Sequence, residues 1–154
     1  MGGGGLEGPG RPEGLEGLAI LVASESLFLR HYFSYIFEKR HTLRLAASGR
    51  EAIEQMASLS GPQGALRPFD LVFINEYLPD MGAAELLEKI GRSHPGTKSF
   101  VLLTHSNDAR RLVERHGAAG VIMKPFTTSD VLKRIREALP AGKINITNDF
   151  PPHF

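Results

Sequence analysis

The fold of this chain is decided by residues 18–26, which read LAILVASES, six apolar residues followed by a short polar turn. The run is too short for a typical helix and lacks the polar alternation of a half-exposed strand, a pattern typical of strands buried in a parallel sheet. Ser26 can cap a helix over residues 27–39. Apolar side chains recur in this helix at helical spacing: Leu29, Phe33, Ile36 and Phe37. The segment therefore predicts the first strand–helix unit of an α/β domain.

The same unit recurs along the chain. Further strands are expected at residues 42–46, 69–74, 99–104 and 121–123, and helices at 50–59, 83–91, from 107 or 108 to 116, and 127–139. Ser48 is the expected cap of the second helix and Thr128 or Ser129 that of the last, and Gly117 can supply a left-handed residue after the fourth. Five strands that alternate with five helices imply right-handed crossovers and a parallel sheet covered on both faces. We therefore predict a flexible Gly-rich leader at residues 1–17, one α/β domain at 18–140, and a tail or the start of a linker at 141–154.

Composition argues against several classes of protein. The 154 residues include 18 Lys and Arg and 17 Asp and Glu, and a net charge of +1 gives no field that favours nucleic acid or an anionic membrane. The chain has no cysteine, which removes disulfides, thiolate zinc sites and cysteine nucleophiles and fits a reducing compartment. No segment reaches the roughly 18 apolar residues of a membrane span. We expect a cytoplasmic domain with no nucleic-acid or membrane partner.

In open parallel sheets, functional groups gather at the carboxyl ends of the strands. In this chain that rule selects five polar residues: Ser24, Glu25, Asn75, Thr104 and Lys124. They are the candidate site. No metal-ligand spacing is found among the six histidines, so we expect no histidine metal site.

Residues 18–139 resemble the receiver domain of bacterial response regulators. Five segments carry the resemblance, in this order and at these strand ends: ILVASE at 20–25, DLVFIN at 70–75, LPDM at 78–81, VLLT at 101–104 and GAAGVIMKPF at 117–126. The resemblance implies a flavodoxin-like (βα)5 doubly wound sheet with strand order 2-1-3-4-5. It also implies a cis peptide bond between Lys124 and Pro125 and a role in two-component phosphorelay signalling.

In this family an acidic pair after the first strand and an Asp after the third bind Mg²⁺, and that Asp accepts the phosphoryl group. A Thr or Ser and a Lys then hold the phosphoryl oxygens. In this chain Asn75 stands at the acceptor position, and its amide oxygen is a very poor nucleophile. Ser24 replaces the first acid and leaves Glu25. The charges of Glu25 and Lys124 cancel, so this pocket is neutral, whereas a pocket with three carboxylates and one Lys is doubly negative. We therefore expect Mg²⁺ binding to be weak or absent, and we expect no other cofactor.

Three further departures from the family agree with a loss of this chemistry. His105 follows Thr104 where a small residue is usual, and we expect its ring to crowd the pocket. Ala83 stands at a usual glycine position, and Val121 stands where many receivers have the aromatic residue that moves on activation. An ion pair between Glu25 and Lys124 can fill the space. The alternative is a retained site for a small anion.

Two surface features are candidate interfaces. The helix over residues 27–39 is unusually aromatic, and some of its rings can lie outside the core stripe; the alternative is a broad core face with one solvated tyrosine. The last two helices carry a basic stripe where receivers commonly dock dimer mates or effector domains; the alternative is a solvated face laced with acidic residues. The interface candidates are Tyr32, Tyr35, Arg111, Arg115, Lys133 and Arg134.

We therefore predict an atypical receiver, a pseudo-receiver that is not phosphorylated at Asn75, has no enzymatic activity and acts by protein–protein interaction. Its partner would be an effector domain, a kinase or another signalling protein, and a homodimer through the last helices is one option. One alternative is a domain gated by a small anion or metabolite at the remnant pocket. Another is an Asp-to-Asn form of an ordinary response regulator. An enzyme using Lys124, Thr104 and Glu25 would lack a second acid, base or nucleophile.

Overall fold

The computed structural model describes residues 17–37, 39–58 and 69–139. Five strands lie within these ranges: β2 (Ala19–Ala23), β3 (Thr42–Ala46), β4 (Leu71–Asn75), β5 (Lys98–Leu103) and β6 (Gly120–Met123). The helices are α1 (Leu27–Phe37), α2 (Gly49–Ser58), α3 (Ala83–Ser93), α4 (Ala109–Glu114) and α5 (Thr128–Ala138), with a 3₁₀ turn, η2 (Ser106–Asp108), before α4. Each predicted strand and helix is present, with bounds that differ by no more than two residues. The predicted leader and tail fall outside the described residues, apart from Gly17.

The strands form one parallel sheet in the order β3-β2-β4-β5-β6. In chain order this is 2-1-3-4-5, so the predicted flavodoxin-like topology is confirmed. Ala23 pairs with Ala46 on one side and with Ile74 on the other, and Asn75 pairs with Leu102. The carboxyl ends of neighbouring strands therefore lie side by side at one edge, where the strand order reverses.

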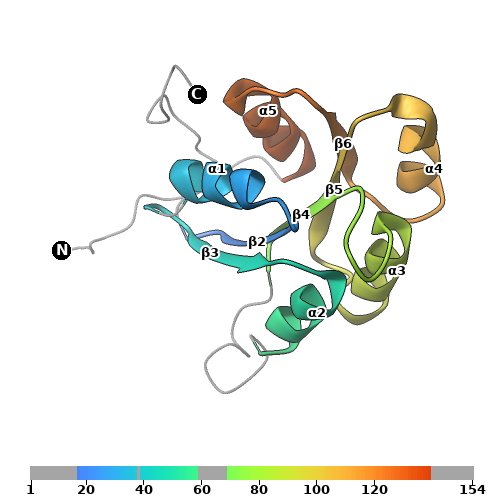
Figure 1. Cartoon of the computed structure of the whole chain (residues 1–154), viewed down its shortest axis with the longest axis horizontal. Coiled ribbons are helices and arrows are strands. Elements are labelled where there is room, and N and C mark those ends of the chain that lie inside the picture. Colours follow the sequence, from blue (N-terminus) through green and yellow to red (C-terminus); the bar gives the residue numbers. More distant parts are fainter. Residues whose placement is uncertain (1–16, 38, 59–68, 140–154) are drawn as a thin grey trace.

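Helices cover both faces of the sheet, with α1 and α5 on one face and α2, α3 and α4 on the other (Figure 1). The two apolar layers that result are separate clusters, because successive side chains of a strand point to opposite faces. In β2, Leu21 packs under α2 and α3, whereas Ile20 and Val22 pack under α1 and α5. All five residues of β2 are buried, as expected for a strand with a neighbour on each side and helices on both faces.

Stacked aromatic rings fill the layer beneath α1. The ring of Phe33 lies 4.9 Å from that of Phe73, which lies 5.5 Å from that of Phe100. The four predicted core residues of α1 are all buried: Leu29, Phe33, Ile36 and Phe37. The aromatic character of this helix is therefore explained in part by its packing on the sheet.

Tyr32 is also part of this core, which corrects its prediction as an interface residue. Its side chain is 7% exposed, and its ring lies edge-on to Phe126 at 5.5 Å. The hydroxyl shares a hydrogen bond of 3.1 Å with the Thr128 hydroxyl at the start of α5. The prediction was wrong because the apolar face of α1 is wide enough to pack against both the sheet and α5.

Short polar side chains start three of the helices. The hydroxyls of Ser26 and Ser48 accept the backbone N–H three residues later, at 3.2 and 3.1 Å, as expected for caps of α1 and α2. At α5 the cap is Thr127 instead of the predicted Thr128 or Ser129. Thr127 forms a capping box with Asp130, which satisfies two backbone N–H groups at once, while the Thr128 hydroxyl is used by Tyr32.

Two backbone features agree with the sequence analysis. The peptide bond between Lys124 and Pro125 is cis, and Gly117 has φ of 86°, in the left-handed region expected after α4. Within the described ranges, no helix has both the length and the apolar character needed to span a membrane.

Candidate functional site

The five candidate residues lie together at the carboxyl edge of the sheet, which we call the strand-end site: Ser24, Glu25, Asn75, Thr104 and Lys124. Backbone pairing continues just beyond the strands and fixes their neighbours. The N–H of Ser24 donates to Ala46 O at 2.9 Å, and the N–H of Lys124 donates to Leu103 O at 2.7 Å. The sheet register thus holds the side chains at one edge, as the strand-end rule predicts.

Asn75 and Lys124 are joined at the centre of this site. The Lys124 ammonium donates a hydrogen bond of 2.7 Å to the Asn75 amide oxygen, and both residues are half-buried. The predicted ion pair between Glu25 and Lys124 is wrong, because Glu25 is exposed to solvent and Lys124 uses the amide instead. An exposed carboxylate stays hydrated. Forming a buried ion pair would remove that hydration, and the attraction to the ammonium would have to offset the free energy lost.

Glu76, which sequence reasoning missed, is a further member of the strand-end site. Its carboxylate accepts a hydrogen bond from the backbone N–H of Thr104, and its own N–H donates to Leu102 O at 3.1 Å. The strand-end rule was applied only to the last residue of β4, and Glu76 follows directly. The available signal was a carboxylate adjacent in sequence to Asn75 at a switch-point strand.

The oxygen atoms at this edge do not fit the magnesium ion that the family resemblance implies. Ser24 is buried, and its hydroxyl oxygen accepts the Ser26 N–H at 3.0 Å. The Asn75 amide oxygen faces the Lys124 ammonium, and the Glu76 carboxylate is held by Thr104. Among the described residues, no cluster of three or more His, Cys, Asp or Glu side chains can hold a metal ion. A hard divalent cation would thus meet an ammonium group where it needs charged oxygen ligands.

The loop after β4 is fastened to the start of α2. The Asp80 carboxylate accepts the backbone N–H groups of Gly49 and Arg50, both at 2.9 Å. These bonds, that of Arg50 first, lower the pKa of the Asp80 carboxyl below its ordinary value. A Cβ atom on Gly49 would lie 2.5 Å from the Met81 sulfur, so a larger residue at this position would require the Met81 side chain to move. Sequence reasoning did not predict this link.

The three further departures occupy different environments. His105 is exposed, so its ring does not fill the pocket, and its effect on entry to the pocket stays a prediction. Ala83 is buried at the start of α3, and Val121 is half-buried against the α2–α4 side of the core. A small aliphatic side chain therefore packs at position 121, where the family resemblance implies an aromatic residue that moves on activation.

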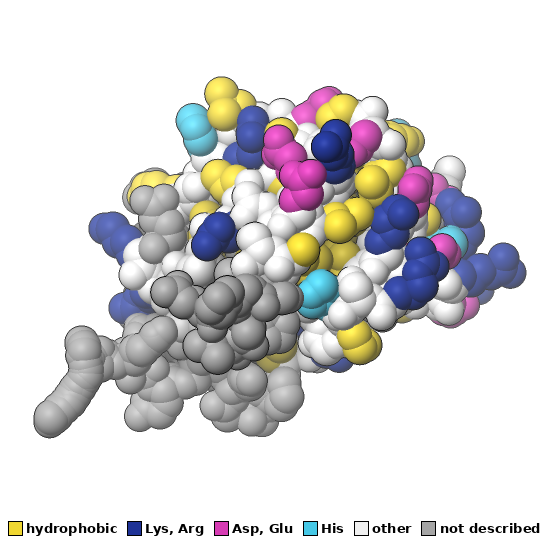
Figure 2. All heavy atoms as spheres, turned by 90° about the horizontal axis from the view of Figure 1, so that it is seen from below, with side chains coloured by type: hydrophobic (Ala, Val, Ile, Leu, Met, Phe, Trp, Pro, Cys, Tyr) yellow, Lys and Arg dark blue, Asp and Glu magenta, His cyan; other side chains and the backbone are white. Residues whose placement is uncertain are grey.

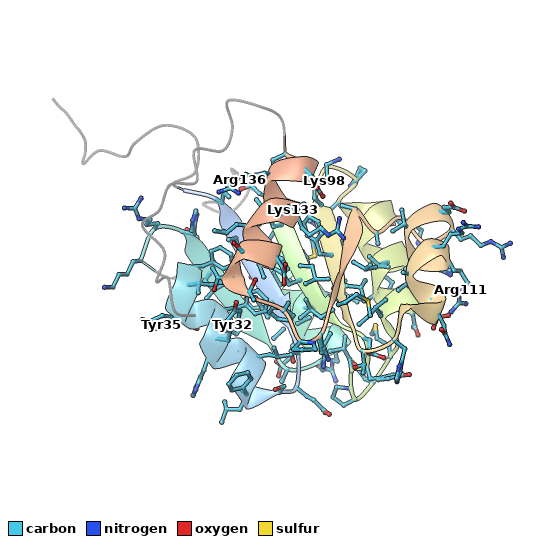
Figure 3. The ribbon with its side chains drawn as sticks, turned by 90° about the horizontal axis from the view of Figure 1, so that it is seen from above. Tyr32, Tyr35, Lys98, Arg111, Lys133 and Arg136 are labelled. Carbon is cyan, nitrogen blue, oxygen red and sulfur yellow. The ribbon has the colours of Figure 1, made fainter. Side chains whose placement is uncertain are left out.

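Exposed apolar side chains remain on α1 after Tyr32 is assigned to the core. Leu27, Phe28 and Tyr35 are 60%, 74% and 57% exposed. Figure 3 shows Tyr35 and Tyr32 on α1, together with basic residues of α4 and α5. Tyr35 is therefore accessible as predicted, and its role in an interface stays a prediction.

The basic residues of α4 and α5 lie on the surface, where several have acidic neighbours. Arg111 donates to Asp108 at 3.0 Å, and Arg134 donates to Glu137 at 3.1 Å. Arg115 and Lys133 are exposed. These pairs agree with the alternative of a solvated face laced with acidic residues, and exposed pairs of this kind contribute little stability. A role for this face in binding stays a prediction.

Comparison with known proteins relates this chain to one family. The sequence profile of the response regulator receiver domain matches residues 20–136. A protein-glutamate methylesterase/protein-glutamine glutaminase from Geobacillus kaustophilus (strain HTA426) is 31% identical over 113 residues, which is 70% of this chain and 30% of that protein. The chain spans only 10% to 30% of the curated relatives that it matches.

Solved structures share the same architecture. The signal receiver domain of an HD domain-containing protein from Pseudomonas fluorescens Pf-5 has a TM-score of 0.70 at 20% identity, over 84% of this chain and 91% of that one. A CheY-like response regulator receiver domain protein from Methanospirillum hungatei JF-1 has a TM-score of 0.65 at 26% identity, over 79% of this chain and 93% of that one.

Proposed function

Since this chain belongs to the response regulator receiver domain family, a family of two-component signalling modules, we propose that it is a pseudo-receiver that is not phosphorylated at Asn75. It acts by binding another signalling protein, such as a kinase or an effector domain. The proposal rests on the chemistry of the strand-end site and on the apolar side chains that α1 presents to solvent.

The hydrogen bond between Lys124 and Asn75 is the observation that carries the proposal. Forming an acyl phosphate requires a carboxylate oxygen to attack phosphorus, and the neutral Asn75 amide is a very poor nucleophile. The amide oxygen of Asn75 also accepts a hydrogen bond of 2.7 Å from the Lys124 ammonium. The neutral amide at this position therefore leaves the site unsuited to phosphoryl transfer.

Glu76 supports the same conclusion through charge. An incoming phosphoryl group carries negative charge, and the Glu76 carboxylate already accepts the Thr104 N–H at this edge. The phosphoryl group would have to compete with this internal anion for the N–H donor and would be repelled by it. The Thr104 N–H donor at this site is therefore already bonded to a carboxylate of the chain itself.

Binding of a protein partner is supported by the start of α1. Leu27 and Phe28 are more than half exposed, directly after the turn that carries Ser24 and Glu25. Exposed aromatic side chains are enriched in protein interfaces and often anchor them. The surface next to the strand-end site is therefore suited to an apolar contact.

Phosphorylation can be tested with acetyl phosphate and Mg²⁺, using the intact mass of the chain as the readout. We expect no gain of a phosphoryl group, and no amide shifts at Asn75, Thr104 or Lys124 on adding beryllofluoride. A phosphoryl group gained by the native chain and retained by an Asn75→Ala variant would place phosphorylation at another residue. A gain that this variant loses would overturn the proposal. Saturable shifts with inorganic phosphate alone would favour the anion-gated alternative.

A further inference from the structure

A groove of about 420 Å³ lies between α2 and α3, on the face opposite α1 and α5. We call it the α2–α3 groove. Figure 2 views the molecule from this side and shows hydrophobic side chains gathered on the surface, with Lys, Arg, Asp and Glu side chains around them. The strand-end site uses none of the residues that line this groove.

The floor of the groove is apolar. Met56 of α2 and Ile90 of α3 form its base and are 3% and 2% exposed, while Ile53 and Ala57 line the α2 wall and are more accessible. Because Met56 and Ile90 are almost fully covered by the fold, the apolar atoms that a partner could reach in this groove belong mainly to Ile53 and Ala57. Burial of that surface by a partner would be favourable.

The rim of the groove is basic. Lys89, Arg92 and His94 all come from α3 or the residue after it, and the described residues that line the groove include no carboxylate. Arg92 is exposed and forms no ion pair with a described residue. The carboxylate of Glu85 lies 4.0 Å from the Lys89 ammonium, an exposed pair that is easily exchanged for another partner.

The polar atoms at the end of the groove are already engaged. The Ser93 hydroxyl donates to Lys89 O at 3.0 Å and lies 2.8 Å from His94 Nδ1. Sites for small polar molecules need a few convergent, unengaged polar groups to fix orientation. An apolar floor with a charged rim instead matches the recognition of an amphipathic helix, which places apolar side chains in the groove and charges along its edges.

We propose that the α2–α3 groove binds an acidic amphipathic helix of a partner protein. Apolar side chains of that helix would contact Ile53 and Ala57 above the buried Met56 and Ile90, and its carboxylates would face Lys89 and Arg92. The inference rests on the proposed protein-binding function, but not on the chemistry of Asn75.

The test is an NMR titration of the full chain with a synthetic helix of about 15 residues that has Leu at helical spacing and Glu elsewhere. A matched peptide with Lys in place of Glu serves as the control ligand. We expect the acidic peptide to shift the methyl resonances of Ile53, Met56 and Ile90, and the basic peptide to leave them unchanged. Increasing salt should weaken the binding, because the rim charges are exposed.

Two variants sharpen the test. Arg92→Glu replaces an attraction with a repulsion and should weaken binding about fivefold or more. The same change at exposed Arg110 on α4 is the matched control and should leave binding unchanged. Ala57→Glu places a carboxylate on the groove wall and should abolish binding of the acidic peptide. Both positions in the groove are exposed, so the fold should tolerate these changes.

Several outcomes would overturn the proposal: no shifts in the groove, equal binding of both peptides, or shifts confined to α1 and the strand-end site. Groove shifts that depend on protein concentration without peptide would assign this face to a second copy of the chain instead. The phosphodonor assay separates the two proposals. If neither peptide binds and Asn75 stays unmodified, the groove assignment fails while the proposed pseudo-receiver stands.

Discussion

The Lys124 ammonium lies 2.7 Å from the Asn75 amide oxygen, so the ends of β6 and β4 are joined across the end of β5. A neutral amide accepts this bond without the burial of a second charge. The contact links the ends of two strands that are not neighbours in the sheet. It also explains why the predicted ion pair with Glu25 is not formed.

Lys124→Met should therefore lower the free energy of unfolding by about 1 kcal/mol, because the half-buried Asn75 oxygen loses its donor. Equilibrium urea unfolding measures the change. Lys133→Met makes the same substitution at an exposed site on α5 and should change stability by less than about 0.5 kcal/mol. Equal effects at the two positions would mean that the hydrogen bond contributes nothing.

Magnesium binding should appear when carboxylates are introduced at positions 24 and 75. The double variant Ser24→Asp and Asn75→Asp adds two charged oxygen ligands beside Glu25, which a divalent cation requires. In an amide NMR titration with Mg²⁺ we expect saturable shifts at the strand-end site for the double variant and none for the native chain. The same saturation in the native chain would show that the present oxygen atoms suffice for binding.

The fold was predictable because its signals are local and repeated. A buried run such as residues 18–23 can be identified without knowledge of its neighbours, and the order of five such units permits few topologies. The helix caps Ser26 and Ser48 were predictable for the same reason. The observed cap of α5, Thr127, lies one residue before the predicted Thr128. Several adjacent hydroxyls can cap this helix, and only the reciprocal bond of Asp130 decides between them.

The membership of the candidate site was also predictable, but its internal contacts were not. Strand ends bring Asn75, Thr104 and Lys124 to one edge whatever their partners are. Whether the Lys124 ammonium bonds to Asn75 or to Glu25 depends on the reach of its side chain and on the hydration of each acceptor. Sequence spacing carries no information on either. Glu76 and Asp80 were missed for a related reason, because each bonds to backbone N–H groups, which any residue can supply.

Glu76→Ala should expose the Thr104 N–H and remove a negative charge from the strand-end site. Inorganic phosphate should then bind, with saturable amide shifts at Thr104 and Lys124 that the native chain does not show. Glu76→Gln removes the charge but keeps an acceptor, so it should bind phosphate more weakly than the alanine variant. If neither variant responds to phosphate, Glu76 does not act as an internal competitor for anions.

Stability in acid should depend on Asp80. Two backbone N–H groups of α2 lower the pKa of its carboxyl, so the contribution is fully present above the ordinary value of 3.8 and is lost as the pH falls through the folded-state pKa. Asp80→Asn should be less stable than the native chain at neutral pH, and the difference should shrink in acid. Chemical denaturation across this range measures it. Glu114→Gln, a surface change on α4 at a carboxylate that pairs with Arg110, should show no such convergence.

Alkaline stability should depend on Tyr32, whose phenol is buried between α1 and α5. Burial raises the pKa of Tyr32 above its ordinary value of 10.0; the hydrogen bond with Thr128 opposes this, and the nearby charge of Asp130 adds to it. A raised pKa means that the folded state holds the proton more tightly than the unfolded state. The contribution is therefore fully present below pH 10.0 and is lost as the pH rises through the folded-state pKa.

Tyr32→Phe should consequently remove this alkaline loss while costing about 1 kcal/mol at neutral pH through the missing hydrogen bond to Thr128. Tyr35→Phe, three residues along α1 at an exposed position, is the matched control and should keep the native pH dependence. Unfolding curves recorded from neutral to alkaline pH compare the three proteins. If the Tyr32→Phe and native curves fall together in alkali, ionisation of Tyr32 does not limit the packing of α1 on α5.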